Sequence, residues 1–287
     1  MSKSSPGTVY LVGAGPGAAD LITLRGANLL AKADIVFHDA LVDSAMLELC
    51  PQAIQVAIGK RCGKLSSAQE FINKRLVDAA KKYQTIVRLK GGDPMLFGRA
   101  DEELGALQAA GIPFEIVPGI TAALAGAASL QKSLTLRGIA RSVAFVTLAK
   151  ASDASESINR ADNCSQQPIA HPNADTLVYY MGRKDAAHIA QQLIASSPNH
   201  HGDTPVHILE AVSTAKERHW ESTLSALAQG KADEWFDQSS PALILIGQAL
   251  ETIQAAQSIQ ANLQSPSSKI DNRLQNSQVL PYSRRRA

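Results

Sequence analysis

Residues Thr85–Arg99 read TIVRLKGGDPMLFGR, and this stretch decides how the chain is expected to fold. Its first residues are largely apolar and β-branched, which predicts a buried strand over 85–89. Two glycines, an aspartate and a proline follow shortly after. Glycine allows close approach and positive φ, whereas proline stiffens a loop, so the combination is typical of a loop that touches a ligand. Such loops lie at the carboxyl edge of parallel sheets, where open α/β folds bind their ligands.

The same alternation of short apolar runs and amphipathic runs extends over most of the 287 residues. In the first half, we predict strands at 8–12, 34–37, 114–117 and 142–147, and helices at 24–33, 66–83, 100–111 and 121–130. In the second half, we predict strands at 176–181, 205–209 and 242–247, a helix near 184–195 and an exposed hairpin at 216–223. Strands that alternate with helices indicate an α/β fold, mostly parallel in the first half and with antiparallel candidates in the second.

Composition divides the chain into two expected domains. We predict an N-terminal α/β domain over 1–148, a linker or insert over 149–174, a C-terminal α/β domain over 175–263 and a polar tail over 264–287. The linker prediction depends on residues 150–174, which contain few large apolar side chains, a composition typical of a loop or a disordered insert. The tail ends in SRRRA and is expected to be disordered.

Charge is nearly balanced, because the net formal charge is +2 with both signs mixed along the chain. This balance argues against a polybasic nucleic-acid binder. Between residues 60 and 99, however, there are ten Lys or Arg and three Asp or Glu. Part of this excess fits a solvated helix face. The basic residues at predicted loops or strand ends fit an anionic ligand equally well, and they are Lys60, Arg61, Arg88, Lys90 and Arg99.

Cysteine usage and hydropathy indicate the compartment. The three cysteines, Cys50, Cys62 and Cys164, match no metal-binding spacing, so we expect reduced thiols and no metal site. The N-terminal MSKSSPG contains no apolar signal-peptide segment, and no apolar run approaches the roughly 18 residues of a membrane span. We therefore expect a cytoplasmic protein.

A glycine cluster, VGAGPGA at 12–18, follows the first predicted strand. Gly13, Gly15 and Ala18 satisfy the G-x-G-x-x-G/A pattern, and Asp39 follows a second strand, so an NAD-dependent oxidoreductase is one alternative, with Asp39 holding a ribose hydroxyl. Against this alternative, Pro16 removes a backbone N–H that a pyrophosphate would need. The next helix is also predicted to begin near Thr23, well after the glycines. Taken alone, the cluster could be an ordinary turn after a strand.

The glycine cluster is not alone, because GGDP and VPGITAA also end predicted strands. Three such loops can bring backbone N–H and carbonyl groups close to one ligand. We expect an uncrowded, partly apolar cofactor there. A nucleoside triphosphate is not expected, because the chain contains no G-x-x-x-x-G-K-[ST].

The motifs VGAGPG, DLITLRG, HDALV, GKR, VRLKGGDPMLFGR, VPGITAA and YYMG occur in this order. In this respect the chain resembles the uroporphyrinogen-III C-methyltransferases over about residues 8–250. The resemblance implies two α/β domains of the tetrapyrrole methylase type, with S-adenosylmethionine in the cleft between them, and a homodimer. It also implies methylation of uroporphyrinogen III at C2 and C7 to give precorrin-2 through precorrin-1.

The resemblance also implies roles for single residues. Asp39 matches the proton acceptor and Lys60 the proton donor. The cofactor site is expected to include Pro16, Gly91, Gly92, Asp93, Leu96, Thr121, Ala122, Met181 and Val212. In this interpretation Asp93 fixes the pose of the cofactor, and Leu96 and Met181 contact its adenosine part, although methionine is also a common core residue.

The eight carboxylates of the implied substrate call for guanidinium partners. Arg25, Arg61, Arg99 and Arg137 lie in or beside the motifs and are the expected group, with ordinary surface ion pairs as the alternative for each. Several positions depart from the family pattern; among them, Leu136 replaces a common histidine, and Val212 replaces a glycine that contacts the cofactor. These departures keep an inactive tetrapyrrole carrier as an alternative. Methylation of a later corrinoid precursor is a separate alternative that also stays open.

Overall fold

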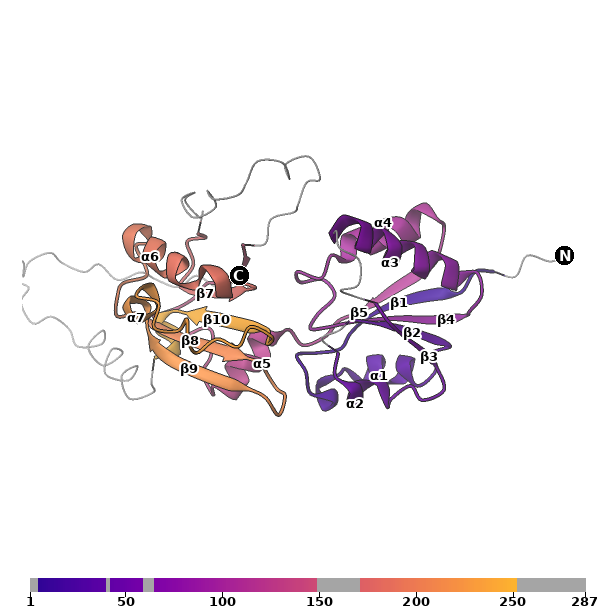
Figure 1. Ribbon diagram of the computed structural model, residues 1–287, viewed down its shortest axis with the longest axis horizontal. Coiled ribbons are helices and arrows are strands. Elements are labelled where there is room, and N and C mark those ends of the chain that lie inside the picture. The colour runs from indigo at the N-terminus through magenta and orange to yellow at the C-terminus, as the bar shows by residue number, and fades with distance from the viewer. Residues whose placement is uncertain (1–4, 40–41, 59–64, 149–170, 252–287) are drawn as a thin grey trace, which may run out of the picture. The chain divides into compact units, whose positions relative to one another are not determined.

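The computed structural model describes residues 5–39, 42–58, 65–148 and 171–251. These residues form two five-stranded sheets, each covered by helices (Figure 1). An α/β fold with a parallel first half and antiparallel strands in the second half is thereby confirmed. The insert predicted at 149–174 lies outside the described residues except for 171–174, and the tail predicted at 264–287 lies outside them entirely.

The first sheet is entirely parallel, with the strand order β3-β2-β4-β1-β5. Its strands are β1 (Thr8–Gly13), β2 (Ile35–His38), β3 (Ile54–Ala57), β4 (Thr85–Lys90) and β5 (Phe114–Val117). The central strand β4 is buried at every position after Thr85, as expected for a parallel strand covered on both faces. Because β4, β1 and β5 are neighbours, the loops that leave their carboxyl ends share one stretch of the sheet edge.

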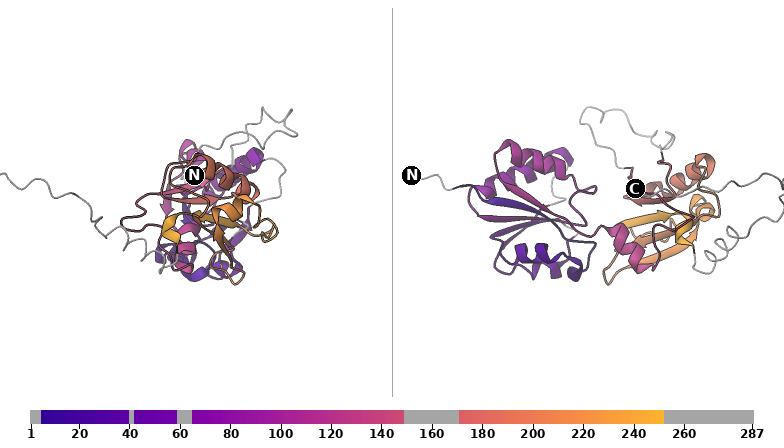
Figure 2. Two further views of the ribbon diagram at one scale, coloured as in Figure 1. Left: turned by 90° about the vertical axis from the view of Figure 1, so that its left-hand side faces the viewer. Right: turned by 180° about the vertical axis from the view of Figure 1, so that it is seen from behind.

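Helices cover both faces of the first sheet, as Figures 1 and 2 show. One layer consists of α1 (Leu24–Leu30) and α2 (Ser44–Leu47), and the other consists of α3 (Leu65–Ala80) and α4 (Ala100–Ala109). Alternate residues of β4 serve the two layers: Val87 packs in the core with α1 and α2, and Ile86 packs in the core with α3 and α4.

Local signals explain where two of these helices begin or end. The Thr23 hydroxyl accepts a hydrogen bond from the Gly26 N–H at 3.2 Å, which caps α1 as predicted. Gly111 follows α4 with a φ of 66°, a left-handed conformation that stops a helix and favours glycine.

The second sheet is mixed, with the strand order β6-β7-β10-β8-β9. Its strands are β6 (Val143–Thr147), β7 (Thr176–Tyr180), β8 (Pro205–Glu210), β9 (Arg218–Thr223) and β10 (Ala242–Ile246). Only the β6–β7 pair is parallel among these strands. On one face lie α6 (Ala186–Ser196) and α7 (Leu224–Ala228), and on the other lies α5 (Ala122–Ser129). Short 3-10 turns are η1 (Ala19–Leu21), η2 (Arg183–Asp185) and η3 (Gln248–Leu250).

The strand predicted at 142–147, at the end of the N-terminal domain expected over 1–148, forms as β6. β6 pairs with β7, from Val143 opposite Thr176 to Thr147 opposite Tyr180, and therefore belongs to the second sheet. Helix α5 also packs in a core with residues of the second sheet. The first sheet ends with Val117. We infer that the chain passes from one sheet to the other within residues 118–121.

None of the helices in the described part of the chain has the length and apolar character needed to cross a membrane.

A buried charge cluster, made of Arg88 and Lys90 on β4 and Glu103 on α4, joins the central strand to its helical cover. The three residues are 2%, 3% and 0% exposed. Glu103 Oε1 accepts from Arg88 Nε at 3.1 Å and from Lys90 Nζ at 3.0 Å. Gln69 Nε2 on α3 donates to the same oxygen at 3.3 Å. Burial, and then the nearby Arg88 charge, lower the pKa of Lys90.

The variant Glu103→Ala is expected to lower the free energy of unfolding by about 3–5 kcal/mol, because it leaves the buried Lys90 without its counter-charge and removes one of the two carboxylates paired with Arg88. Urea denaturation followed by circular dichroism measures this. The matched control is Glu102→Ala, which removes the neighbouring carboxylate from an ion pair with Arg99 whose side chains are both 42% exposed. That change is expected to cost about 1 kcal/mol or less. Equal losses in the two variants would contradict a special role for the buried charge cluster.

Candidate functional site

The loops after β1, β4 and β5 touch each other through three glycines. A Cβ added at Gly119 would lie 2.3 Å from the Gly92 carbonyl oxygen and 2.8 Å from Gly13 Cα, which no side chain tolerates. Gly15 and Gly92 also form a bridge, in which the Gly92 N–H donates to the Gly15 carbonyl at 2.7 Å and the Gly15 N–H donates back at 3.2 Å. The convergence of these loops, predicted from their glycines, is therefore present.

Asp93 holds two of these loops together. Its Oδ2 accepts from the Gly119 N–H at 2.8 Å, and its Oδ1 accepts from the Met95 N–H at 2.8 Å. A carboxylate oxygen can accept more than one hydrogen bond, so Asp93 keeps acceptor capacity for a ligand. The other cofactor residues predicted in the loops after β1 and β4 are all partly exposed, and they are Pro16, Gly91, Gly92 and Leu96.

Tyr180, at the end of β7, forms hydrogen bonds with the first residues of α5 and with Thr121 before it. Its hydroxyl accepts from the Ala123 N–H at 3.1 Å and shares a hydrogen bond of 2.5 Å with Thr121 Oγ1. Burial raises the pKa of Tyr180, so its hydroxyl keeps its proton. The predicted residues Thr121 and Ala122 therefore lie beside a tyrosine that the sequence analysis does not single out. Its position at the end of an apolar strand, next to Met181, was the available signal.

An aromatic cluster of Phe97, Phe145 and Tyr180 surrounds this point. The rings of Phe97 and Tyr180 have centroids 5.1 Å apart, and those of Phe145 and Tyr180 are 6.1 Å apart with an interplanar angle of 89°. Such separations are typical of favourable aromatic pairs. Phe97 follows the GGDP motif, so the aromatic cluster joins the loop after β4 to the strand ends of the second sheet.

Exposed apolar side chains on strained backbone mark the same region. Met181 is 57% exposed and has a φ of 57°, and Phe97 is 38% exposed and has a φ of 52°. A left-handed conformation costs a residue with a Cβ about 1–2 kcal/mol. Strain of this kind gathers at binding sites. Met181 is not a core residue, and the two side chains offer apolar contact to a ligand.

Val212 sits between two left-handed residues, Ala211 with a φ of 50° and Ser213 with a φ of 61°. Its own side chain is only 5% exposed and packs in the core below α5. The Ser213 hydroxyl accepts from the Ala18 N–H at 3.1 Å, which brings this loop to the loop after β1. Because the Val212 side chain is buried, only the backbone at this position could contact a ligand.

Asp39 follows β2 and forms an ion pair with Arg88 of the buried charge cluster. Its Oδ1 accepts from Arg88 Nη2 at 2.6 Å, and its side chain is 32% exposed whereas that of Arg88 is 3% exposed. Arg88 is in turn bonded to Glu103. The carboxylate is thus fixed on one side and open on the other, as a proton acceptor requires. Lys60, its predicted partner, lies outside the described residues.

The predicted arginines lie on separate elements. Arg25 on α1 pairs with Glu115 of β5 at 3.1 Å. Arg99 is bonded to Glu102 through two hydrogen bonds of 2.5 and 2.7 Å. Arg137 is exposed in the turn before β6, and Arg61 lies outside the described residues. Their role toward a substrate stays a prediction.

The dinucleotide alternative finds no support in the loop after β1. The 3-10 turn η1 follows the glycines, and α1 begins only at Leu24. The N-terminus of α1 is therefore not placed directly after Gly15, where a pyrophosphate would need it.

Comparison with known proteins agrees with this geometry. A sequence model of the family Tetrapyrrole (Corrin/Porphyrin) Methylases matches residues 8–228. The chain is 40% identical over 250 residues to a siroheme synthase of Pseudomonas fluorescens, covering 86% of this chain and 51% of that protein. It is 42% identical over 246 residues to siroheme synthase 1 of Klebsiella pneumoniae, covering 85% and 49%. The chain spans about half the length of the curated relatives that it matches.

Solved structures resemble the chain over nearly its whole described length. The uroporphyrin-III C-methyl transferase from Thermus thermophilus complexed with S-adenyl homocysteine is 35% identical, with a TM-score of 0.68, and the match covers 85% of this chain and 94% of that one. Cobalt precorrin-4 methyltransferase matches with a TM-score of 0.69 at 24% identity, which shows the fold alone.

Replacing glycine by alanine is expected to change the free energy of unfolding in opposite directions at Gly119 and at Gly105. Gly119→Ala is expected to lower the free energy of unfolding by about 1–3 kcal/mol, because the methyl group overlaps the backbone of Gly92 and Gly13. Gly105→Ala, in α4, meets nothing within 4 Å and is expected to raise it by about 0.5–1 kcal/mol. Chemical denaturation of both variants beside the parent measures the sign. A stabilising Gly119→Ala would contradict the close approach.

Proposed function

This chain belongs to the tetrapyrrole (corrin/porphyrin) methylases, and from that premise we propose that it methylates uroporphyrinogen III at C2 and C7. The product is precorrin-2, formed through precorrin-1, and S-adenosylmethionine is the methyl donor. The observation that carries the proposal is the 35% identity to the Thermus thermophilus enzyme, which spans 94% of that chain in its complex with S-adenyl homocysteine. The siroheme synthases are about twice as long, so the proposal covers only methylation.

The converging loops fit the proposed methyl donor. Gly92 has a φ of 68°, and a Cβ built on it meets nothing within 4 Å, so the backbone is open to a ligand at this point. Phe97, in the same loop, and Met181, which follows Tyr180 in the chain, add exposed apolar surface. The residues expected to hold the donor are Pro16, Gly91, Gly92, Asp93, Leu96, Thr121, Ala122 and Met181, with the backbone of Val212.

When bound, S-adenosylmethionine supplies a methyl group that its sulfonium makes electrophilic. The work left to the chain is to align that group with a pyrrole carbon, and alignment alone is worth roughly 7–11 kcal/mol. The direct contacts among the three glycines, and the bridge from Asp93 to Gly119, favour a rigid site of this kind. Rigid donors and acceptors lose little freedom when a ligand binds.

Asp39 is the proposed proton acceptor, because the macrocycle must lose a proton after each methylation. Its ion pair with Arg88 sets the direction of the carboxylate, and the side chain remains 32% exposed and so accessible to a substrate. Glu103 holds Arg88 from the opposite side. Asp39 therefore acts on the substrate, and Arg88 and Glu103 act as positioning residues.

Substrate binding and assembly are proposed on the resemblance. Arg25, Arg99 and Arg137 are described, exposed arginines in or beside the motifs, and they are expected to meet substrate carboxylates together with Arg61. We also expect a homodimer, which sedimentation analysis of the purified chain would test.

Incubation of the purified chain with S-adenosylmethionine and freshly made uroporphyrinogen III tests the activity. The expected result is a product heavier by two methyl groups, with two equivalents of S-adenosylhomocysteine. A parallel incubation with precorrin-2 tests the later-precursor alternative, and calorimetric titration with NADH tests the oxidoreductase alternative. No mass gain on uroporphyrinogen III, together with a gain on precorrin-2 or tight NADH binding, would reverse the proposal.

Asp39→Asn separates proton transfer from cofactor binding. The amide keeps an oxygen for Arg88 but cannot accept the substrate proton, so kcat is expected to fall by about 10²–10⁴-fold. The affinity for S-adenosylhomocysteine, measured by calorimetry, is expected to stay within about twofold. Asp203→Asn, at an exposed turn, is the control and should leave both values unchanged. Full activity in Asp39→Asn would remove this residue from the mechanism.

A further inference from the structure

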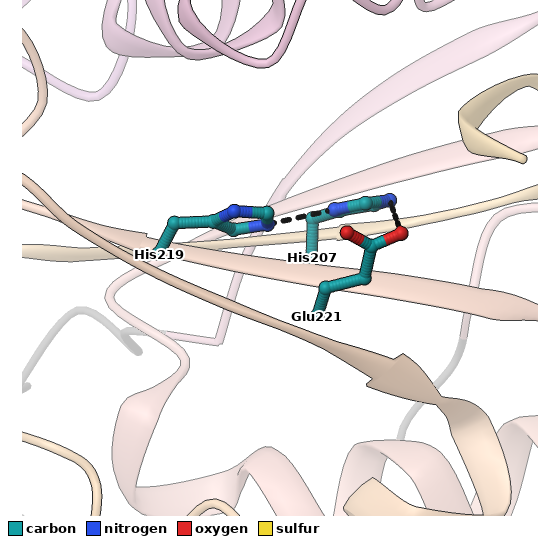
Figure 3. Close-up of side chains that lie close together, drawn as sticks. All are labelled: His207, His219 and Glu221. Atoms are coloured by element: carbon teal, nitrogen blue, oxygen red, sulfur yellow. Dashed lines mark hydrogen bonds and ion pairs between the residues drawn. The ribbon is translucent and has the colours of Figure 1, made fainter. Parts of the chain in front are cut away.

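Three side chains with metal-ligating atoms gather on the pair of strands β8 and β9, and none of them belongs to the site described above. They are His207 on β8 and His219 and Glu221 on β9, and one nitrogen or oxygen from each lies within 4.8 Å of the others (Figure 3). The strand register explains the grouping. His207 pairs directly with Glu221, and His219 lies two residues before Glu221, on the same face of its strand.

His207 is already oriented for a metal ion. The residue is fully buried, and its Nε2 lies 3.0 Å from the Leu250 carbonyl oxygen. A carbonyl can only accept, so Nε2 carries the proton and Nδ1 keeps a free lone pair. That lone pair faces His219 Nε2 at 2.9 Å. Metal-binding histidines usually donate their other ring N–H to a backbone carbonyl or carboxylate in this manner.

Together the three side chains offer two imidazoles and one carboxylate on one face of the strand pair. The two rings are nearly parallel, with centroids 5.1 Å apart, and Glu221 adds a carboxylate whose side chain is 50% exposed.

The distances are close to those of a tetrahedral site. Zinc lies about 2.0–2.2 Å from nitrogen and oxygen ligands, which places neighbouring ligand atoms about 3.3 Å apart. The two histidine nitrogens must therefore separate by about 0.4 Å. The Glu221 carboxylate, whose Oε1 lies 3.9 Å from His207 Nε2, must move to the Nδ1 side of the ring. Both adjustments fall on His219 and Glu221, which are exposed, and His207 stays where Leu250 holds it.

We propose that His207 Nδ1, His219 Nε2 and the Glu221 carboxylate form a site for a divalent transition metal of the zinc type, with water completing the coordination. Two imidazoles and one carboxylate suit zinc and its neighbours in the first transition row, whereas magnesium and calcium prefer oxygen ligands alone. The ion would join β9, the edge strand of the second sheet, to β8 and, through His207, to η3. Bound metal is therefore expected to stabilise this edge.

Calorimetric titration of the full chain with zinc chloride, after removal of any affinity tag, tests the site. One equivalent of zinc is expected to bind, and magnesium chloride is expected to give no heat above dilution. His219→Gln and Glu221→Gln are each expected to weaken zinc binding about tenfold or more. His201→Gln replaces an exposed histidine outside the cluster and should leave the affinity unchanged. The variants spare His207, because a change at that buried position could unfold the sheet.

Cobalt(II) as a second probe distinguishes the ligand atoms. The visible spectrum of the cobalt-loaded chain is expected to show nitrogen and oxygen ligation and to change in both variants. A thiolate-to-metal charge-transfer band would place the ion at a cysteine and overturn the proposal. Zinc binding that persists unchanged in the double variant His219→Gln, Glu221→Gln, or no zinc binding at all, would overturn it as well. None of these measurements depends on methyl transfer.

Discussion

Three loops touch at the edge of the first sheet because Gly13, Gly92 and Gly119 carry no Cβ. A Cβ at Gly13 would lie 2.7 Å from the Gly92 carbonyl oxygen, and one at Gly119 would lie closer still, at 2.3 Å. This contact lets Asp93 reach the N–H of Gly119. It thereby sets where Phe97 and the start of α5 lie. The proposed binding surface thus follows from a steric constraint on three backbone positions.

A second constraint comes from charge. Arg88 is buried between Asp39 and Glu103, and a buried cation that loses a partner is costly, so its bonds to the two carboxylates are hard to rearrange. The ion pair with Arg88 therefore fixes the Asp39 carboxylate, although its side chain is partly exposed. Glu103 Oε2 has no hydrogen-bond partner among the described residues, so Glu103 holds both Arg88 and Lys90 through Oε1.

Much of the fold could be predicted from the sequence, because β1, β4 and β10 are apolar runs that end in glycine or turn residues. Strand β3 was missed, since three of its four residues are exposed and its pattern resembles a loop. The sequence of β6 alone could not show which sheet the strand joins, because that depends on its pairing with the distant strand β7. The role of Tyr180 and the grouping of His207 with His219 depend on pairing between distant segments in the same way.

The order of the strands also shapes how the molecule forms during synthesis. Thr8 of β1 pairs with Thr85 of β4, and Val9 pairs with Phe114 of β5, so β1 is synthesised before both of its partners. At roughly 5–20 residues per second, the wait for β4 lasts about 4–15 seconds. During that interval an apolar strand, TVYLVG, has no sheet to join. The nascent chain therefore carries an unpaired apolar strand until β4 and β5 emerge.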